Sequence, residues 1–147
     1  MERKELERLA IEFTEAFNRE DIDEMMSYFA EDAVYDEFNG QRQVGLAAIR
    51  AAFEPQFRGD FGRMRFHAED MFLDAENGKA MISWLCTLET AERAGGWRGL
   101  DILHFQQGRL VEKRTYAKTR APDLVKKQNM ADWPDEQSVA DRLAADD

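Results

Sequence analysis

The sequence has a single cysteine, Cys86, and only two histidines among its 147 residues. One cysteine excludes an intramolecular disulfide, and such scarcity is typical of a reducing compartment, so we expect a cytoplasmic protein. Cysteine and histidine are too few to form the ligand spacing of a zinc or iron site. We therefore expect no metal at the functional site.

Other signals are missing as well. No apolar run reaches 18 residues, so no membrane span is expected. Lys and Arg number 20 against 30 Asp and Glu, and the resulting net charge of −10 repels nucleic acids and anionic membranes. No glycine-rich loop opens a helix, and no serine sits in a nucleophile elbow. The sequence thus predicts no cofactor, no nucleic-acid partner and no membrane partner.

Bulky apolar side chains are present in quantity, with ten Phe, three Trp and three Tyr. A chain of 147 residues suits one domain that buries a sizeable core. These aromatic residues can line a pocket as well as fill the core. We therefore expect the partner to be a small, largely apolar molecule.

Helical signals fill the first third of the chain. Apolar residues at helical spacing predict an amphipathic helix that ends near Asn18, and a short helix capped by Asp21 or Asp23 should follow and include Phe29. Residues 33–38 read as a strand. A third helix should be closed by Pro55. The apolar positions of the first helix are Leu6, Leu9, Ala10, Phe13, Ala16 and Phe17.

The remaining pattern has the period of strands. Residues 63–73, 79–90, 97–106 and 109–118 are separated by turn signals, which predicts an antiparallel meander after the helices and hence the α+β class. We assign residues 1–120 to one domain and residues 121–147 to an acidic C-terminal extension that could form one short helix. This extension is either a mobile tail or a segment that packs, through Trp133, on a partner subunit or over the pocket mouth.

One carboxylate falls on a face that should be buried. Asp101 alternates with Leu103 and Phe105, and burial of an unpaired carboxylate raises its pKa and leaves a neutral hydrogen-bond donor. The alternatives are that Asp101 pairs with a buried arginine or backbone amide, or lies at the sheet rim. Leu100 and Ile102 form the opposite apolar face, which predicts contact with a second subunit and a homodimer.

Two further strands bear on the pocket. Glu37 lies just before the turn Asn39-Gly40, where it is either functional or simply solvated. In residues 79–90, Ser83 and Leu85 share a face that mixes apolar and hydroxyl groups, so this face is the better candidate for the cavity. Trp84 lies on the opposite face of the strand, and the sequence leaves open whether it lines the cavity or the dimer interface. The basic stretch from Lys113 to Arg120 reads as a solvated strand face.

Two stretches are similar to the nuclear-transport-factor-2-like superfamily, which includes ketosteroid isomerases and SnoaL-like polyketide cyclases. They are FAEDAVYDE followed by GLAAIR, at residues 29–37 and 45–50, and DILHF followed by GRLVE, at residues 101–105 and 108–112. The resemblance spans roughly residues 5–119. It implies a cystatin-like cone, in which a curved antiparallel sheet wraps around three N-terminal helices and encloses a cavity, and it implies a dimer.

The resemblance also implies roles for individual residues. Glu37 takes the place of the general base, one methylene longer than the usual Asp, and Asp101 takes the place of a protonated acid in the oxyanion hole. Phe13, Phe29 and Phe53 stand where isomerases carry tyrosines, so the strongest hydroxyl donor is missing. The expected substrate-binding residues are Phe13, Phe29, Tyr35, Phe53, Ser83, Leu85, Leu103 and Thr115.

Two functional hypotheses follow from this resemblance. In the first, the protein is a cofactor-independent isomerase, dehydratase or cyclase that acts next to a carbonyl of a small apolar substrate, with Glu37 and Asp101 as catalytic residues. In the second, it is a non-catalytic ligand-binding or dimeric assembly module of the same fold.

Overall fold

The computed structural model describes residues 1–119, 126 and 134–144. Its centre is a curved six-stranded sheet in the order β2-β1-β6-β5-β4-β3, with β2 and β3 as the two edges. All neighbouring strands are antiparallel except β1 and β6, which run parallel. The strands are β1 (Phe29–Asp36), β2 (Arg42–Val44), β3 (Arg63–Asp74), β4 (Lys79–Glu89), β5 (Ala94–Gln106) and β6 (Arg109–Lys118).

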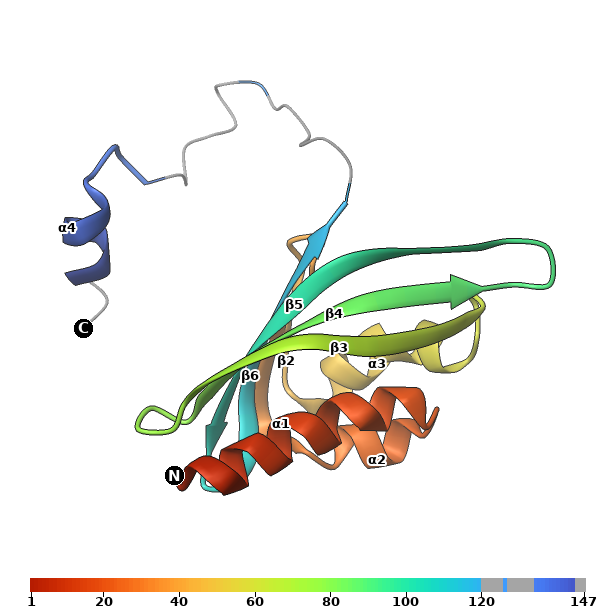
Figure 1. The fold of residues 1–147 in the computed structure, drawn as a ribbon, viewed down its shortest axis with the longest axis horizontal. Helices are drawn as coiled ribbons and strands as arrows, with labels where there is room; N and C mark the ends of the chain where they lie inside the picture. The colour runs from red at the N-terminus through yellow and green to blue at the C-terminus, as the bar shows by residue number, and fades with distance from the viewer. Residues whose placement is uncertain (120–125, 127–133, 145–147) are drawn as a thin grey trace.

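Three helices pack against the same face of this sheet, namely α1 (Arg3–Asn18), α2 (Ile22–Met26) and α3 (Leu46–Phe57) (Figure 1). Helix α1 ends at the predicted residue, and Asn18 fastens that end to β3. Its side-chain amide donates to the Phe66 carbonyl over 2.9 Å and accepts from the Phe66 N–H over 2.8 Å. The predicted α+β class, with a curved sheet around N-terminal helices, is confirmed.

The two shorter helices show one agreement and two differences. Asp21 caps α2 as predicted, by accepting a hydrogen bond from the Glu24 N–H over 3.1 Å. Phe29, which was expected in this helix, begins β1 instead. Helix α3 continues to Phe57 past Pro55, so the proline does not end the helix as predicted. The N–H of Arg58 still donates to the Glu54 carbonyl over 2.9 Å.

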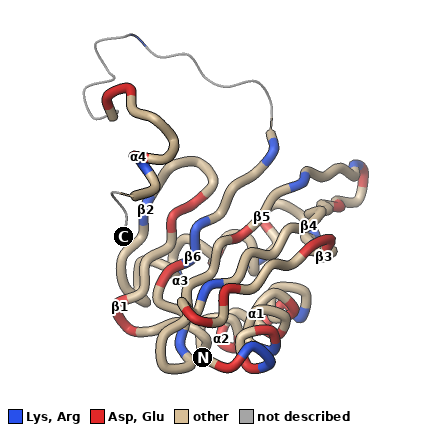
Figure 2. The backbone as a smooth tube through the Cα atoms, turned by 60° about the vertical axis from the view of Figure 1, so that its left-hand side comes forward, with Lys and Arg blue, Asp and Glu red and all other residues tan. Residues whose placement is uncertain are grey.

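A fourth helix, α4 (Val139–Ala144), lies in the stretch where one short helix was expected. The proposed domain boundary at residue 120 and Trp133 fall outside the described residues, so the role of the extension stays a prediction. In the described part of the chain, no helix has the length and apolarity that a membrane crossing requires. Lys and Arg are interspersed with Asp and Glu over its helices and strands (Figure 2).

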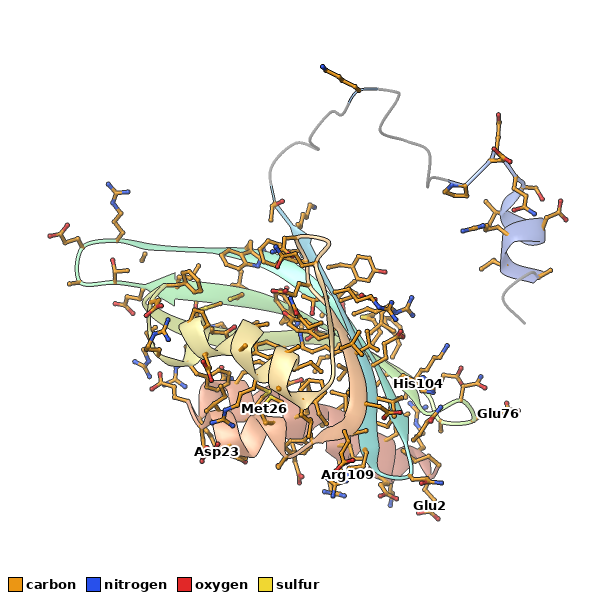
Figure 3. All side chains as sticks on the ribbon, turned by 180° about the vertical axis from the view of Figure 1, so that it is seen from behind. Glu2, Asp23, Met26, Glu76, His104 and Arg109 are labelled. Carbon is orange, nitrogen blue, oxygen red and sulfur yellow. The ribbon has the colours of Figure 1, made fainter. Side chains whose placement is uncertain are left out.

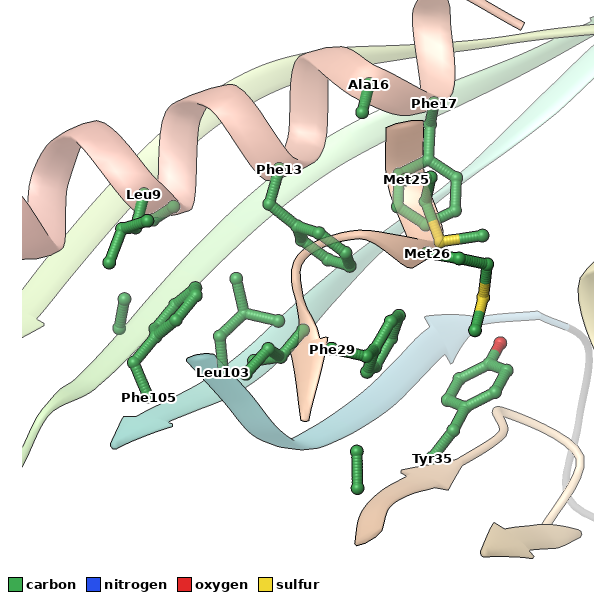
Figure 4. Packing of buried hydrophobic residues seen from close by; sticks show 14 of the residues in the cluster. Leu9, Phe13, Ala16, Phe17, Met25, Met26, Phe29, Tyr35, Leu103 and Phe105 are labelled. Atoms are coloured by element: carbon green, nitrogen blue, oxygen red, sulfur yellow. The ribbon is translucent and has the colours of Figure 1, made fainter. Parts of the chain in front are cut away.

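An aromatic core fills the space between α1 and the sheet (Figure 4). Phe13 is fully buried and meets Phe17, Tyr28 and Phe29 edge to face, with ring centroids between 5.3 and 5.7 Å apart. Such pairs contribute about 0.5–1.5 kcal/mol each beyond their burial. Phe13 and Phe29 are therefore part of the core that joins α1 to the sheet.

Candidate functional site

A cavity of about 480 Å³ lies between the sheet and helices α1 and α3. Most of its wall is apolar, and the polar side chains in it are those of Thr14, Glu37, Asn39, Gln56, Asp101, Lys113 and Thr115. A volume of this size is within the range of small-molecule sites. The principal aromatic residues of the wall are Phe17, Tyr35, Phe53, Phe66, Trp84 and Trp97.

A buried ion pair forms the polar end of the cavity. Asp101 and Lys113 are 5% and 4% exposed, and the ammonium of Lys113 donates to Asp101 Oδ1 over 3.0 Å. Thr115 Oγ1 donates to the same oxygen over 2.6 Å, and Trp84 Nε1 donates to Oδ2 over 3.2 Å. The carboxylate therefore acts as an acceptor in each of these contacts. This arrangement replaces the neutral donor expected at Asp101 with the ion-paired alternative, with lysine in place of arginine.

Lys113 is enclosed by aromatic rings as well as by its acidic partner. Its Nζ lies 4.6 Å from the ring centroid of Tyr35, 5.5 Å from that of Phe53 and 5.6 Å from that of Phe17. Burial works to lower the pKa of Lys113, but the negative charge and hydrogen bond of Asp101 outweigh it, so the pKa is raised. The ammonium therefore stays charged at neutral pH inside a largely apolar wall.

The ring of Tyr35 packs against this ammonium. Its ring stacks on Phe53 with centroids 4.5 Å apart and an interplanar angle of 11°. Burial raises the pKa of the Tyr35 phenol, against the opposing effect of Lys113. The hydroxyl thus remains protonated and can donate a hydrogen bond at neutral pH.

Glu37 lies just beyond the end of β1, where the chain turns back into β2. The turn is held by the Glu37 N–H, which donates to the Gln41 carbonyl over 2.8 Å. The half-buried carboxylate accepts a hydrogen bond from Gln43 Nε2 over 2.9 Å. Glu37 lines the same cavity as the Asp101–Lys113 pair, and an acidic group with one firm hydrogen bond can accept a proton there.

The structure brings only some of the expected site residues together. Glu37, Asp101, Tyr35, Phe53 and Thr115 line the cavity. By contrast, Phe13, Phe29 and Leu103 are core residues that do not line the cavity, so their expected placement in it is wrong. All three point inward, but they lie in the part of the cone that α1 fills.

The expected orientation of β4 is reversed. Ile82 pairs with Asp101 across the ladder, and directly paired residues share a face, so the even-numbered residues of β4 point inward. Trp84 therefore lines the cavity, while Ser83 and Leu85 lie on the outer face. Trp84 pairs with Gly99, whose lack of a side chain leaves room for the indole ring.

Lys113 was missed because its basic neighbours suggested a solvated face. The alternation of side chains along a strand could have predicted its position in the cavity. Lys113 and Thr115 are two residues apart on β6, so placing Thr115 in the cavity also places Lys113 there. The ladder agrees, with Thr115 opposite Asp101 and Lys113 opposite Leu103.

A Trp84→Phe variant should test the value of the indole hydrogen bond to Asp101. We expect the free energy of unfolding to fall by about 1.5–3 kcal/mol, because a hydrogen bond to a buried charge is lost. Urea denaturation measures this change in the free energy of unfolding. Trp97→Phe is the matched control, because Trp97 lines the cavity at a half-buried position and should cost less. Equal losses in the two variants would show that the hydrogen bond adds no stability.

Cys86 is buried behind this wall, and burial raises the pKa of its thiol to about 11. At pH 8 the reactive thiolate is then about one part in a thousand. We expect the native protein to react with Ellman's reagent far more slowly than glutathione does, and to react fully once unfolded in guanidinium. A native rate equal to that of glutathione would contradict this environment.

Comparisons with known proteins agree with this architecture. The family model of the SnoaL-like domain matches residues 10–113. Among the described residues, no group of three His, Cys, Asp or Glu side chains is placed to hold a metal ion. No curated protein shows significant similarity to the sequence.

Several solved structures share the fold. A putative polyketide cyclase from Xanthomonas campestris pv. campestris is 22% identical with a TM-score of 0.68, over 78% of this chain and 90% of that one. An NTF2-like protein of unknown function from Mesorhizobium loti is 22% identical with a TM-score of 0.67, over 81% and 96%. The epoxide hydrolase/cyclase-like enzyme SalBIII, which has a role in pyran ring formation in the polyether salinomycin, is 14% identical with a TM-score of 0.71, over 80% and 93%.

Proposed function

Because the chain belongs to the SnoaL-like domain family, we propose that its cavity binds a small, largely apolar carbonyl compound and moves a proton next to the carbonyl group. The observation that carries this proposal is that Glu37 and a buried ion pair line one largely apolar cavity. A base and a fixed charge in a water-poor space are what proton transfer from carbon requires.

Glu37 is the general base in this proposal. Its carboxylate takes a proton from the carbon beside the carbonyl, and the electron pair of the broken C–H bond moves to the carbonyl oxygen and forms an enolate. Protonated Glu37 then returns the proton to another carbon, which completes an isomerisation. In a dehydration, the enolate instead expels a hydroxyl group from the next carbon, and this group takes the proton from Glu37 and leaves as water. In a cyclisation, the enolate carbon attacks a second carbonyl group of the substrate, and the oxygen of that group takes the proton from Glu37. No cofactor takes part in these steps.

Exchange of carbon-bound protons tests this proposal without knowledge of the natural substrate. A panel of cyclic ketones, including 2-tetralone, 2-indanone and cyclohexanone, is incubated with the protein in D₂O and followed by proton NMR. We expect faster exchange of the protons beside the carbonyl for at least one bicyclic ketone. If the protein accelerates exchange of none of them above the rate in buffer, the enzymatic proposal is wrong.

A specific observation favours the second hypothesis, a binding module without chemistry. Asp101, the second proposed catalytic acid, already accepts hydrogen bonds from Lys113, Thr115 and Trp84, so both of its carboxylate oxygens are engaged within the protein. A cavity that binds the bicyclic ketones without exchanging their protons would support this alternative.

The expected homodimer is part of the proposal. Leu100 and Ile102 are half-buried on the sheet face that α1–α3 leave uncovered, and Phe72 and Tyr116 are 65% and 52% exposed. We expect a dimer at micromolar concentration by light scattering after size exclusion. Ile102→Glu should shift it to a monomer, because a charge cannot be buried between two sheets. A monomeric native protein would contradict this prediction.

A further inference from the structure

The ammonium of Lys113 has one hydrogen-bond donor more than its described partners use. A lysine ammonium carries three N–H donors. Asp101 Oδ1 accepts one over 3.0 Å, and Thr115 Oγ1 accepts a second over 2.6 Å. The third has only aromatic rings beside it among the described residues, the nearest being Tyr35 at 4.6 Å from the centroid, and a ring face is a weaker acceptor than an oxygen.

Both members of the ion pair form part of the cavity wall. A pair that only stabilised the fold would have no need to face a space for a ligand, and replacing such pairs with apolar residues is often neutral or stabilising. Here the pair lies at the polar end of a wall made mostly of aromatic rings. An oxygen atom of a ligand is the group that can complete the donors of Lys113 there.

We propose that Lys113 binds the carbonyl oxygen of the ligand and polarises it, with Asp101 as the positioning residue that holds the ammonium in place. This inference rests on the proposed function in one respect, the carbonyl group of the ligand. Lys113 thereby takes over the part that the resemblance assigned to a protonated Asp101.

The charges in the cavity suit this assignment. The Asp101–Lys113 pair is neutral as a whole, and Glu37 is the further acidic group in the wall. When Glu37 takes up the proton it becomes neutral, and the negative charge moves to the carbonyl oxygen beside the ammonium. The charge therefore moves toward a fixed cation within a largely apolar wall, where electrostatic stabilisation is stronger than in bulk water. Trp84 and Thr115 hold the carboxylate of Asp101 so that it stays behind the ammonium.

The test uses 9-fluorenone, a flat aromatic ketone that has no proton on the carbons next to its carbonyl and therefore cannot react. Its carbonyl stretch is followed by infrared difference spectroscopy with ¹⁸O-labelled ligand. With the native protein we expect the band to lie at lower frequency than in cyclohexane, because Lys113 donates to the oxygen. We expect the dissociation constant to rise about ten- to a hundred-fold when this donor is removed.

The variant that removes the donor is the double replacement Asp101→Asn with Lys113→Met, which leaves no unpaired buried charge and should fold. In it the band should return toward its cyclohexane position. Asp101→Asn alone should give a smaller shift than the native protein. Lys118→Met is the matched control, since Lys118 is exposed on the same strand, and it should leave the band unchanged.

The outcomes separate this inference from the proposed function. A band at its cyclohexane position in the native protein, a band that the double replacement does not move, or a failure of fluorenone to bind would each overturn the inference, even if ketone protons exchange. A shifted band that depends on Lys113 would support it even if no ketone proton exchanges, in which case the enzymatic proposal alone is wrong.

Discussion

Replacing Glu37 by glutamine is expected to slow exchange of the ketone protons by about 100- to 10,000-fold, the usual contribution of a general base. Glutamine has nearly the same shape, and its amide oxygen can still accept the hydrogen bond from Gln43 Nε2 that holds the native side chain. It cannot accept a proton at neutral pH. The fold and the affinity for fluorenone should therefore change little, while the exchange rate measured by proton NMR collapses.

The matched control is Glu76→Gln, which makes the same chemical change at an exposed position in the turn between β3 and β4 (Figure 3). Its exchange rate should equal that of the native protein. Native exchange in Glu37→Gln would remove Glu37 from the mechanism and leave another acceptor, or none, as the base.

Replacing Lys113 alone by methionine is expected to lower the free energy of unfolding by about 3–5 kcal/mol. Methionine fills much of the space of the lysine stem, so the loss comes from Asp101, which is left 5% exposed without its cationic partner. Urea denaturation followed by tryptophan fluorescence measures the loss. An effect of this size is a large part of the stability of a small domain.

The double replacement Asp101→Asn with Lys113→Met is the control, and it should recover most of this stability because no charge remains buried. If Lys113→Met were as stable as the native protein, the ammonium would not be compensating a buried charge.

The stability of the native protein at alkaline pH is a second measure of the ion pair. The raised pKa of Lys113 contributes stability that is complete below the ordinary lysine pKa and is lost as the pH rises through the folded value.

These two variants probe different properties of one site. Glu37→Gln is expected to lower the exchange rate and to change the free energy of unfolding little, because glutamine can still accept the hydrogen bond from Gln43. Lys113 is expected to matter for both, because it balances Asp101 and donates to the ligand. If the double replacement is stable but no longer polarises fluorenone, the ion pair is kept for function at no benefit to the fold.

Periodicity alone was enough to predict much of the fold. The end of the first helix at Asn18 and both ends of the strand of residues 109–118 were predicted as observed, because their patterns of apolar residues and turn signals are strong. The burial of Asp101 also followed from alternation with Leu103 and Phe105. Each of these features depends on residues near one another in the chain.

The composition of the cavity depended on contacts that distant segments make. Alternation states which residues of a strand share a face, but the direction of that face is set by the register with the neighbouring strand, and this reversed the expected roles of Trp84 and Ser83. It was the ladder between β5 and β6 that brought Lys113 and Thr115 to Asp101. Position along the cone decided the rest, since Leu103 points inward like Asp101 yet lies where α1 fills the space.

The sequence by itself thus determined the α+β class, the ends of several elements and the burial of one acid. The tertiary structure decided the partner of that acid and which inward side chains meet a cavity instead of a core. The physical reason is the distance along the chain between the residues that interact. Local periodicity measures the burial of a face, whereas an ion pair and a cavity exist only once separate strands and helices are placed against one another.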